Sequence, residues 1–294
     1  MTILVTGAGG LIGAALVPAL RAAGHSVTRA VRRPARAADE STWEPPSGRL
    51  GPGWFEAVVH LAGESLAAGR WTQARRARLR GSRVDVTRAL AEQLVARPPR
   101  VMACASAVGF YGDRGDEWLD ESSAPGAGFL ADLVRDWERA SASLAASGTR
   151  VVHLRLGLVL AKQGGSLAAM RLPFQLGLGG PLGGGKQFWS WIALDDAVAA
   201  FRLAVEQPSL AGAVNVVGPE AVRQASFART LGRVMQRPAL LPAPATALRA
   251  LLGPMADDLV LASARVRPAR LLASGFAFRH PTLEQGLRAA LGVG

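Results

Sequence analysis

The amino-acid sequence predicts an α/β fold, in which a parallel sheet carries helices on both faces and a smaller C-terminal lobe follows. Short apolar runs alternate with helical segments over the first 160 residues, a glycine cluster follows the first run, and the pattern becomes irregular beyond Leu160. Apolar strands that alternate with helices are typical of βαβ units, which place successive strands parallel in one sheet. With 294 residues the chain can bury one large core and an appendage.

The elements of the first half follow from apolar periodicity and from turn residues. A helix over 11–22 ends before Gly24, a residue suited to a helix C-cap. The stretch 34–53 is polar and contains prolines, so we expect a loop there and leave open a short strand around Thr42. The expected strands are 3–6, 26–31, 57–60, 101–105 and 151–156, and the other expected helices are 75–96 and 126–146.

Charge and cysteine content restrict the class of protein. The formal net charge of +12 is carried almost entirely by arginine, because Lys162 and Lys186 are the only lysines, and it favours anionic partners. The basic residues lack interleaved aromatic residues, so we expect no nucleic acid partner. A single cysteine, Cys104, excludes an intrachain disulfide and fits a reducing compartment. There is no signal-peptide pattern and no apolar run of about 18 residues, so we expect a cytoplasmic protein with no membrane partner.

The segment Thr6–Gly13, TGAGGLIG, follows the first strand and opens the first helix. In this context Gly7 permits a tight turn, Gly10 lets a pyrophosphate approach the backbone, and Gly13 allows close helix–strand packing. The N–H groups of the first helical turn, at Leu11 and Ile12, would face the phosphates. We therefore expect a Rossmann-type, doubly wound sheet that binds a dinucleotide; a merely tight turn is the alternative.

Arginines follow the second strand, where an NAD-preferring domain would place an acid for the ribose 2′-hydroxyl. The residues there are Arg29, Arg32 and Arg33, and the first acid is Asp39. Guanidinium groups bind a phosphate bidentately, whereas a carboxylate would repel it. We therefore expect NADP(H), held by Arg32 and Arg33, with a solvated basic loop as the alternative.

Domain boundaries are less distinct than the motif. We expect an NADP-binding Rossmann domain over 1–160 and mostly a substrate-binding lobe with a C-terminal helical segment over 161–294. The stretch 188–217 reads as a return to the sheet, because a strand-like run and a helix precede the strand-like 214–217.

The chain resembles an extended short-chain dehydrogenase/reductase of the NAD(P)-dependent epimerase/dehydratase type. Within that type it is most similar to an atypical bacterial subfamily usually labelled as sugar-nucleotide epimerases. The residues that carry the resemblance span nearly the whole chain: Thr6–Gly13, His60–Glu64, Arg70–Thr72, Ser82, Arg83, Ser106–Gly112, Trp137, Glu138, Gly177–Gly180, Ser190–Ile192, Asp195, Asp196 and Gly275–Pro281.

The resemblance implies roles for several positions. The segment Leu61, Ala62 and Gly63 would run under the cofactor, where small residues admit the ribose and nicotinamide. Arg83 would contact the cofactor or the neighbouring loop, with an exposed helix arginine as the alternative. Related folds often dimerise through a pair of helices, so a homodimer is an option.

The resemblance breaks at the catalytic centre. In the wider family a serine orients the substrate, a tyrosine moves its proton, and a lysine four residues later lowers the pKa of that phenol. Ser106 matches the serine, but alignment on Glu138 places Leu130 and Val134 at the tyrosine and lysine positions. The only tyrosine of the chain, Tyr111, is therefore the candidate acid/base, with loop packing as the alternative. Its phenol would need a cationic neighbour, for which the two lysines, Arg83 and Arg155 are candidates.

Other residues are candidates for contact with a small-molecule substrate. Glu64 follows the cofactor-side glycine, and Lys186 and Gln187 follow the second glycine-rich stretch, where extended family members hold the distal part of the substrate. Trp191 could supply a stacking wall, with packing in the core as the alternative. Asp195 and Asp196 begin a helix and are read as helix-capping acids. The four histidines lack metal-ligand spacing, so we expect no metal.

Two functions remain open on the sequence. The first is an NADP(H)-dependent oxidoreductase or epimerase that acts on a small carbonyl or nucleotide-sugar substrate. The second is an NADP(H)-binding sensor or regulatory protein, because the Tyr-x-x-x-Lys pair is missing. The glycine-rich and tryptophan-containing lobe favours the enzyme.

Overall fold

The computed structural model describes residues 1–293, and its core is an eight-stranded sheet in the order β12-β8-β6-β5-β1-β2-β3-β4. Every neighbouring pair is parallel except β3 with β4, which is antiparallel. The strands are β1 (Thr2–Thr6), β2 (Ser26–Val31), β3 (Glu40–Glu44), β4 (Arg49–Leu50), β5 (Ala57–His60), β6 (Val101–Ala107), β8 (Arg150–Leu156) and β12 (Gly212–Val216). The order reverses between β1 and β5, the point where a doubly wound sheet binds its ligand.

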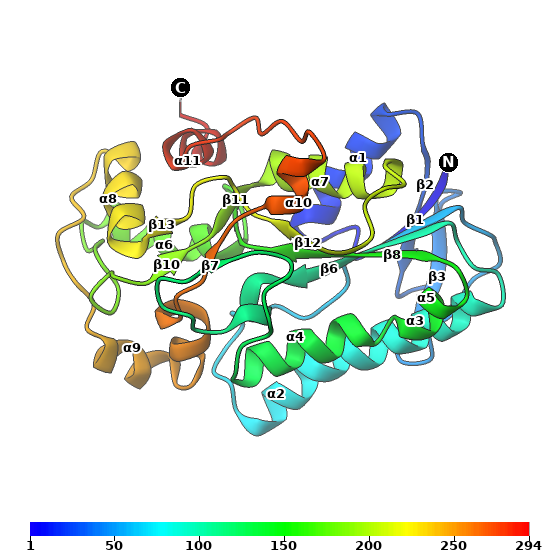
Figure 1. Ribbon diagram of the computed structural model, residues 1–294, viewed down its shortest axis with the longest axis horizontal. Helices are drawn as coiled ribbons and strands as arrows, with labels where there is room; N and C mark the ends of the chain where they lie inside the picture. Colours follow the sequence, from blue (N-terminus) through cyan, green and yellow to red (C-terminus); the bar gives the residue numbers. More distant parts are fainter. Residues whose placement is uncertain (294) are drawn as a thin grey trace.

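Helices cover both faces of this sheet (Figure 1). On one face lie α1 (Leu11–Ala22) and α7 (Leu194–Glu206); on the other lie α2 (Gln73–Arg80), the π-helix η1 (Gly81–Asp85), α3 (Val86–Val95), α4 (Phe129–Arg139) and α5 (Ala142–Ala146). In β1, Ile3 and Val5 belong to the cluster that contains Leu16 of α1, whereas Leu4 belongs to the cluster that contains Leu90 of α3. Central strands are therefore apolar on both faces, as expected of a covered parallel sheet.

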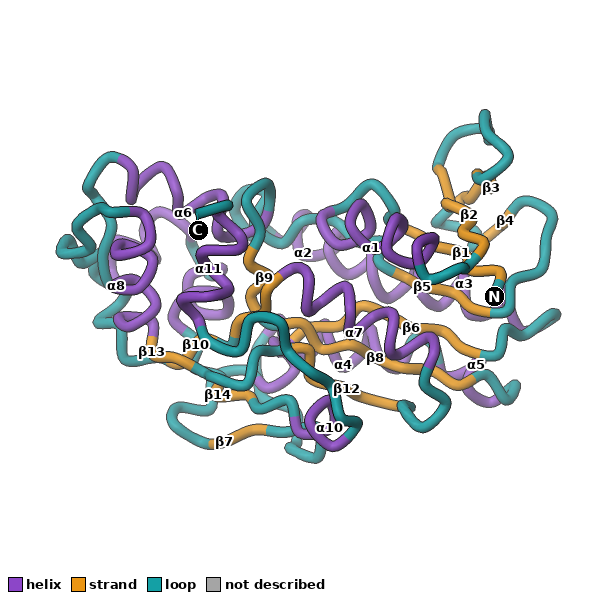
Figure 2. The backbone as a smooth tube through the Cα atoms, turned by 90° about the horizontal axis from the view of Figure 1, so that it is seen from above, coloured by secondary structure: helices purple, strands orange, loops and turns teal. Residues whose placement is uncertain are grey.

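The remaining elements form a lobe at one end of the molecule, away from β2–β4 (Figure 2). Three two-stranded sheets tie it together, because β10 pairs with β13, β11 with β9, and β14 with β7. Its strands are β7 (Trp118–Leu119), β9 (Leu158–Leu160), β10 (Phe188–Trp189), β11 (Trp191–Ala193), β13 (Val222–Arg223) and β14 (Arg265–Val266). Its helices are α6 (Gly165–Gln175), α8 (Gln224–Met235), α9 (Ala245–Leu252), η3 (Ala256–Leu261) and α11 (Leu283–Leu291), whereas α10 (Ala269–Ala273) packs beside β12 of the main sheet.

The predicted fold class, a Rossmann-type doubly wound sheet, is confirmed. Within 34–53 the strand left open around Thr42 is present as β3, and β4 adds a short antiparallel strand beside it. The expected helix over 126–146 is two helices, α4 and α5, that meet at Ser141. Within 188–217, β12 joins the main sheet beside β8. Among residues 1–293, no helix has the length and apolar character needed to cross a membrane.

Candidate functional site

The turn between β1 and α1 requires glycine at two positions. Gly7 has φ +68°, and a Cβ there would lie 2.8 Å from the backbone carbon of Leu61. A Cβ on Gly13 would lie 2.3 Å from the carbonyl oxygen of Gly7. The turn is thus packed against the loop that follows β5, as a close backbone approach demands.

Helix α1 begins with unpaired backbone donors. Its N-cap is Gly10, which offers no side-chain cap, and its first turn contains no acid. Within the described residues, the N–H groups of Leu11, Ile12 and Gly13 have no hydrogen-bond acceptor. Free N–H groups at the positive end of a helix dipole form an anion site, so this turn fits a dinucleotide pyrophosphate.

Thr6 holds the adjoining loop rather than facing solvent. It is fully buried, its hydroxyl lies 2.8 Å from Nδ1 of His60, and it accepts a hydrogen bond from the N–H of Leu61 at 3.2 Å. Burial lowers the pKa of His60 to about 4, so this histidine is neutral near pH 7. The neutral pair fixes the start of the segment Leu61–Gly63, whose members Leu61 and Ala62 are half-buried.

The arginines in and after β2 differ in whether a carboxylate already binds them. Arg29 binds Asp39 through two hydrogen bonds of 3.0 Å, which lowers the pKa of that carboxyl to about 2. Arg33 binds Glu40 through bonds of 2.9 and 2.8 Å. Arg32 is exposed and has no hydrogen bond or ion pair within residues 1–293. Of these three arginines, only Arg32 can therefore bind a phosphate without giving up a carboxylate.

A second arginine cluster lies beside Gly63. Arg83 is 8% exposed, and it donates to the carbonyl of Glu64 at 2.7 Å, while its guanidinium lies 5.3 Å from the ring of Trp137. Burial lowers the pKa of Arg83 to about 10, so it remains charged near pH 7. The Glu64 carboxylate is paired with Arg75. The structure therefore places Arg83 under the loop and leaves Glu64 already engaged.

Ser106 and Tyr111 belong to one buried polar network. Ser106 donates to Glu138 at 2.6 Å, and Arg155 binds both carboxylate oxygens of Glu138 at 2.8 Å. Arg155 also donates to the Tyr111 hydroxyl at 3.0 Å, and that hydroxyl lies 2.8 Å from Oδ1 of Asn215. These residues come from five elements: β6, η2 (Val108–Tyr111), α4, β8 and β12.

Burial limits what this network can do. Tyr111 is 0% exposed and Ser106 is 2% exposed. Burial raises the pKa of Tyr111, which makes the phenolate rarer, although Arg155 opposes the shift. The catalytic assignment of Ser106 and Tyr111 stays a prediction, and their full set of internal partners does not favour it.

The positions that alignment on Glu138 assigns to the family's tyrosine and lysine hold core residues. Leu130 and Val134 are 6% and 1% exposed, and both belong to the main apolar cluster. The side chain of Leu130 lies against Gly109, because a Cβ there would be 2.6 Å from a Leu130 methyl carbon. The face of α4 that carries the acid/base pair elsewhere is apolar here.

The predicted substrate residues of the lobe separate into one exposed and two buried side chains. Lys186 is exposed. Gln187 is 8% exposed and donates to the carbonyls of Leu182 and Val260, both at 3.0 Å. Trp191 is 0% exposed and packs beside Gly286. Of these three, only Lys186 offers a free polar group to a ligand.

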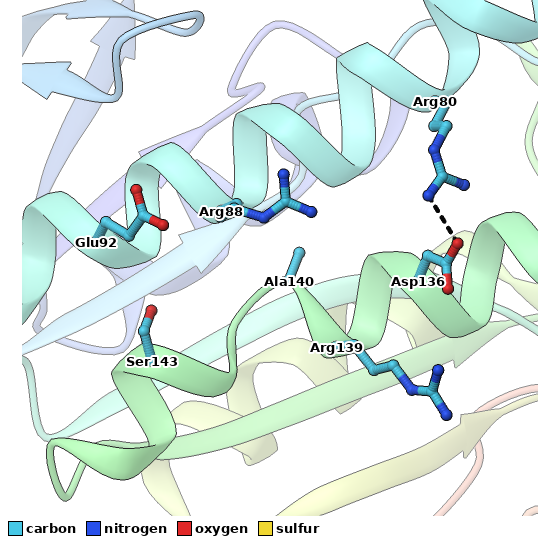
Figure 3. A pocket seen from close by; sticks show the side chains of 7 residues that line it. All are labelled: Arg80, Arg88, Glu92, Asp136, Arg139, Ala140 and Ser143. Carbon is cyan, nitrogen blue, oxygen red and sulfur yellow. Dashed lines mark ion pairs between the residues drawn. The ribbon is translucent and has the colours of Figure 1, made fainter.

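Two surface hollows lie outside the glycine turn. One of about 640 Å³ is lined by Lys186 and Gln187 together with Asp113, Asp116 and Arg223. The other, of about 410 Å³, lies between α2–α3 and α4–α5 (Figure 3). It is lined mainly by charged side chains, among them the ion pair of Arg80 with Asp136 at 2.8 Å. Within the described residues no group of His, Cys, Asp and Glu is arranged to hold a metal ion.

One carboxylate near α4, that of Asp258, is not among the residues that the sequence singled out. Asp258, in η3, accepts a hydrogen bond from the N–H of Leu130 at 3.3 Å. The two residues are far apart in the chain, and no local pattern links them. A titratable side chain therefore lies at the helix start that carries the family's acid/base position.

These features define a dinucleotide-binding protein of the extended short-chain dehydrogenase/reductase type. The chain belongs to the NAD dependent epimerase/dehydratase family, which it matches over residues 3–218. Residues 243–290 match a domain of unknown function, DUF1731. The predicted family is thereby confirmed.

The chain is similar in sequence and in structure to several known proteins. The chain is 42% identical over 288 residues to an epimerase family protein of Mycobacterium bovis, covering 97% of this chain and 96% of the relative. It is 36% identical over 293 residues to the human epimerase family protein SDR39U1, covering 98% and 99%. A crystal structure of human SDR39U1 with NADPH superposes with a TM-score of 0.92 at 34% identity, covering 99% of both chains. MoeE5 in complex with UDP-glucose and NAD is 21% identical with a TM-score of 0.76, and that likeness shows the fold alone.

Proposed function

We propose that the protein is an NADP(H)-dependent oxidoreductase or epimerase that acts on a small carbonyl or nucleotide-sugar substrate. The observation that carries this proposal is the pairing of unbonded N–H groups at Leu11–Gly13 with an unpaired arginine, Arg32, one strand over. The first group suits a pyrophosphate and the second an additional phosphate. The relative that contains NADPH, human SDR39U1, supports the same cofactor.

The bound cofactor would supply a hydride, and the chain would position it. Gly7, Gly10 and Gly13 give the pyrophosphate access to the backbone, and the segment Leu61–Gly63 borders the ribose and nicotinamide. Arg83 supports this segment from beneath through the Glu64 carbonyl. Arg33 would join Arg32 only by exchanging Glu40 for the phosphate.

A second function, NADP(H) sensing without catalysis, rests on a different observation. The positions of the family's tyrosine and lysine are occupied by buried Leu130 and Val134, which transfer no proton. A protein of this kind would bind NADPH as tightly as the enzyme would but convert no substrate.

Titration of the cofactors tests the binding half of the proposal. Arg32→Ala is expected to weaken NADPH binding about 10- to 100-fold, because a hydrogen bond to a charged group contributes roughly 1.5–3 kcal/mol. The affinity for NADH should not change, since NADH lacks the 2′-phosphate. Arg100→Ala is the matched control, because the Arg100 side chain is 75% exposed and Arg100 precedes the amino end of β6, whereas Arg32 follows the carboxyl end of β2.

Equal affinity of the wild-type protein for NADPH and NADH would contradict the cofactor preference. The functional half is tested by NADPH absorbance with small carbonyls and by NADP⁺ reduction with nucleotide sugars. Tight NADPH binding without turnover of any of these substrates would support the sensor function and contradict the enzymatic one.

A further inference from the structure

The start of α4 is completed by a residue from the C-terminal lobe. Its N-cap, Gly128, has φ +105° and no side chain to accept the first N–H groups. Asp258 accepts instead, with Oδ2 3.3 Å from the N of Leu130. Its other oxygen, Oδ1, lies 3.5 Å from the place of a Cβ on Gly128. The carboxylate is thus held at the first turn of α4.

This turn lies at the carboxyl edge of the sheet. Leu130 packs on Gly109, which directly follows β6, and β6 is the neighbour of β5. The same C-terminal segment also reaches the loop after β5, since Arg70 donates to the carbonyl of Ala250 at 3.2 Å. Residues 245–261 therefore contact the loop after β5 and the start of α4, and they lie within the DUF1731 match.

Burial and neighbouring groups act in opposite directions on the pKa of Asp258. The side chain is half-buried, and burial raises its pKa above the ordinary value. The N–H of Leu130 and the cation of Arg76 from α2 lower that pKa, and the neighbouring Asp257 raises it. Asp257 differs: it is exposed and binds Arg249 at 2.9 Å. Of the two adjacent acids, only Asp258 faces α4.

We propose that Asp258 is the proton-transfer residue of this protein, supplied by the C-terminal segment to the end of α4 where the family's tyrosine is replaced by Leu130. The inference rests on the proposed enzymatic function. A helix cap alone needs no more than an acceptor, and Asn or Ser would serve. A carboxyl group at this end of the site does more, because it exchanges a proton.

The step balances as a carbonyl reduction. The hydride of NADPH forms the new C–H bond as the C=O π bond breaks, and the carbonyl oxygen takes the proton of the Asp258 carboxyl. The products are an alcohol, NADP⁺ and the Asp258 carboxylate, which regains a proton from water. In the direction of oxidation the carboxylate accepts the hydroxyl proton.

Asp258→Asn separates proton transfer from capping, because the amide oxygen still accepts from Leu130 but holds no exchangeable carboxyl proton. With NADPH and 9,10-phenanthrenequinone as the carbonyl probe, or NADP⁺ and UDP-glucose as the sugar probe, we expect kcat to fall about 100-fold or more. The Kd for NADPH and the melting temperature should stay unchanged. Asp257→Asn is the matched control and should retain wild-type kcat.

The pH profile gives a second readout that a structural role would not move. Carbonyl reduction by the wild-type protein should slow as pH rises through the pKa of Asp258, and this limb should be absent from Asp258→Asn. Full activity of that variant, or loss of its NADPH binding, would overturn the inference while leaving the proposed function intact. Absence of wild-type turnover with both probes would instead refute the proposed function, and the inference with it.

Discussion

Removal of the Glu138 carboxylate is expected to destabilise the protein strongly. In the wild-type protein this group binds Ser106 and both ends of the Arg155 guanidinium, and the Glu138 and Arg155 side chains are 12% and 5% exposed. In Glu138→Ala the arginine would be buried without a counter-charge. Breaking a buried pair in this way costs about 3–5 kcal/mol, a large share of the roughly 5–15 kcal/mol by which most domains are stable.

Helix α4 also carries an ion pair of the same length that is exposed to solvent, and this pair serves as the control. Asp136 pairs with Arg80 at 2.8 Å, yet the Arg80 side chain is 48% exposed. Asp136→Ala should therefore cost less than about 1 kcal/mol, because exposed ion pairs contribute little. Urea unfolding followed by tryptophan fluorescence at pH 7 measures both variants on one scale.

A double variant distinguishes charge from packing. Glu138→Ala with Arg155→Met removes both charges, and it should be more stable than Glu138→Ala alone because no unpaired cation remains. Glu138→Ala could instead lower the free energy of unfolding no more than Asp136→Ala does. That result would refute the claim that burial makes the loss of the Glu138 carboxylate costly.

Three further outcomes follow from single sites. Gly13→Ala should abolish NADPH binding in isothermal titration, because its Cβ would lie 2.3 Å from the Gly7 carbonyl oxygen; binding at wild-type affinity would show that the turn can relax. Cys104 should resist iodoacetamide at pH 8 until the protein unfolds, since burial raises its thiol pKa to about 12, and rapid labelling of the native protein would contradict this. The hydrogen bonds of Asp120 with Ser122, and then with Arg267, lower its pKa from 3.8 to about 2. Its contribution to stability is therefore present above about pH 4 and lost as pH falls toward 2. Asp120→Asn should flatten that part of the acid unfolding curve, and an unchanged curve would exclude the contribution.

Local patterns predicted the glycine turn and the sheet because their determinants are contiguous. The residues of Thr6–Gly13 act within one turn, and their strand–turn–helix context is visible in the sequence. The partners of the basic loop after β2 were missed for the opposite reason. Asp39 lies ten residues after Arg29 in the sequence, but β3 begins beside β2 and places Glu40 opposite Arg29 in the parallel register.

The partners of the polar residues inside the site depend on tertiary contacts, which the sequence does not show. The sequence offers Arg155 only as one of several candidate cations for Tyr111 and gives no sign of Asn215, since each residue arrives on a different strand. The position of Asp258 depends likewise on how the lobe folds back onto α4. Polar residues that look free in a sequence are satisfied in the core because buried polar groups must find partners.

The chain returns to its main sheet late, and this restricts how it can be divided. A polypeptide cut after residue 160 would keep the glycine turn but lose α7, which packs against α1, and β12, which covers the outer edge of β8. It would expose an apolar sheet face and a row of unsatisfied strand amides, the two features that drive self-association. For this molecule a minimal nucleotide-binding fragment is therefore not a shorter version of the sequence but a rearranged one, with 194–216 joined to the first half.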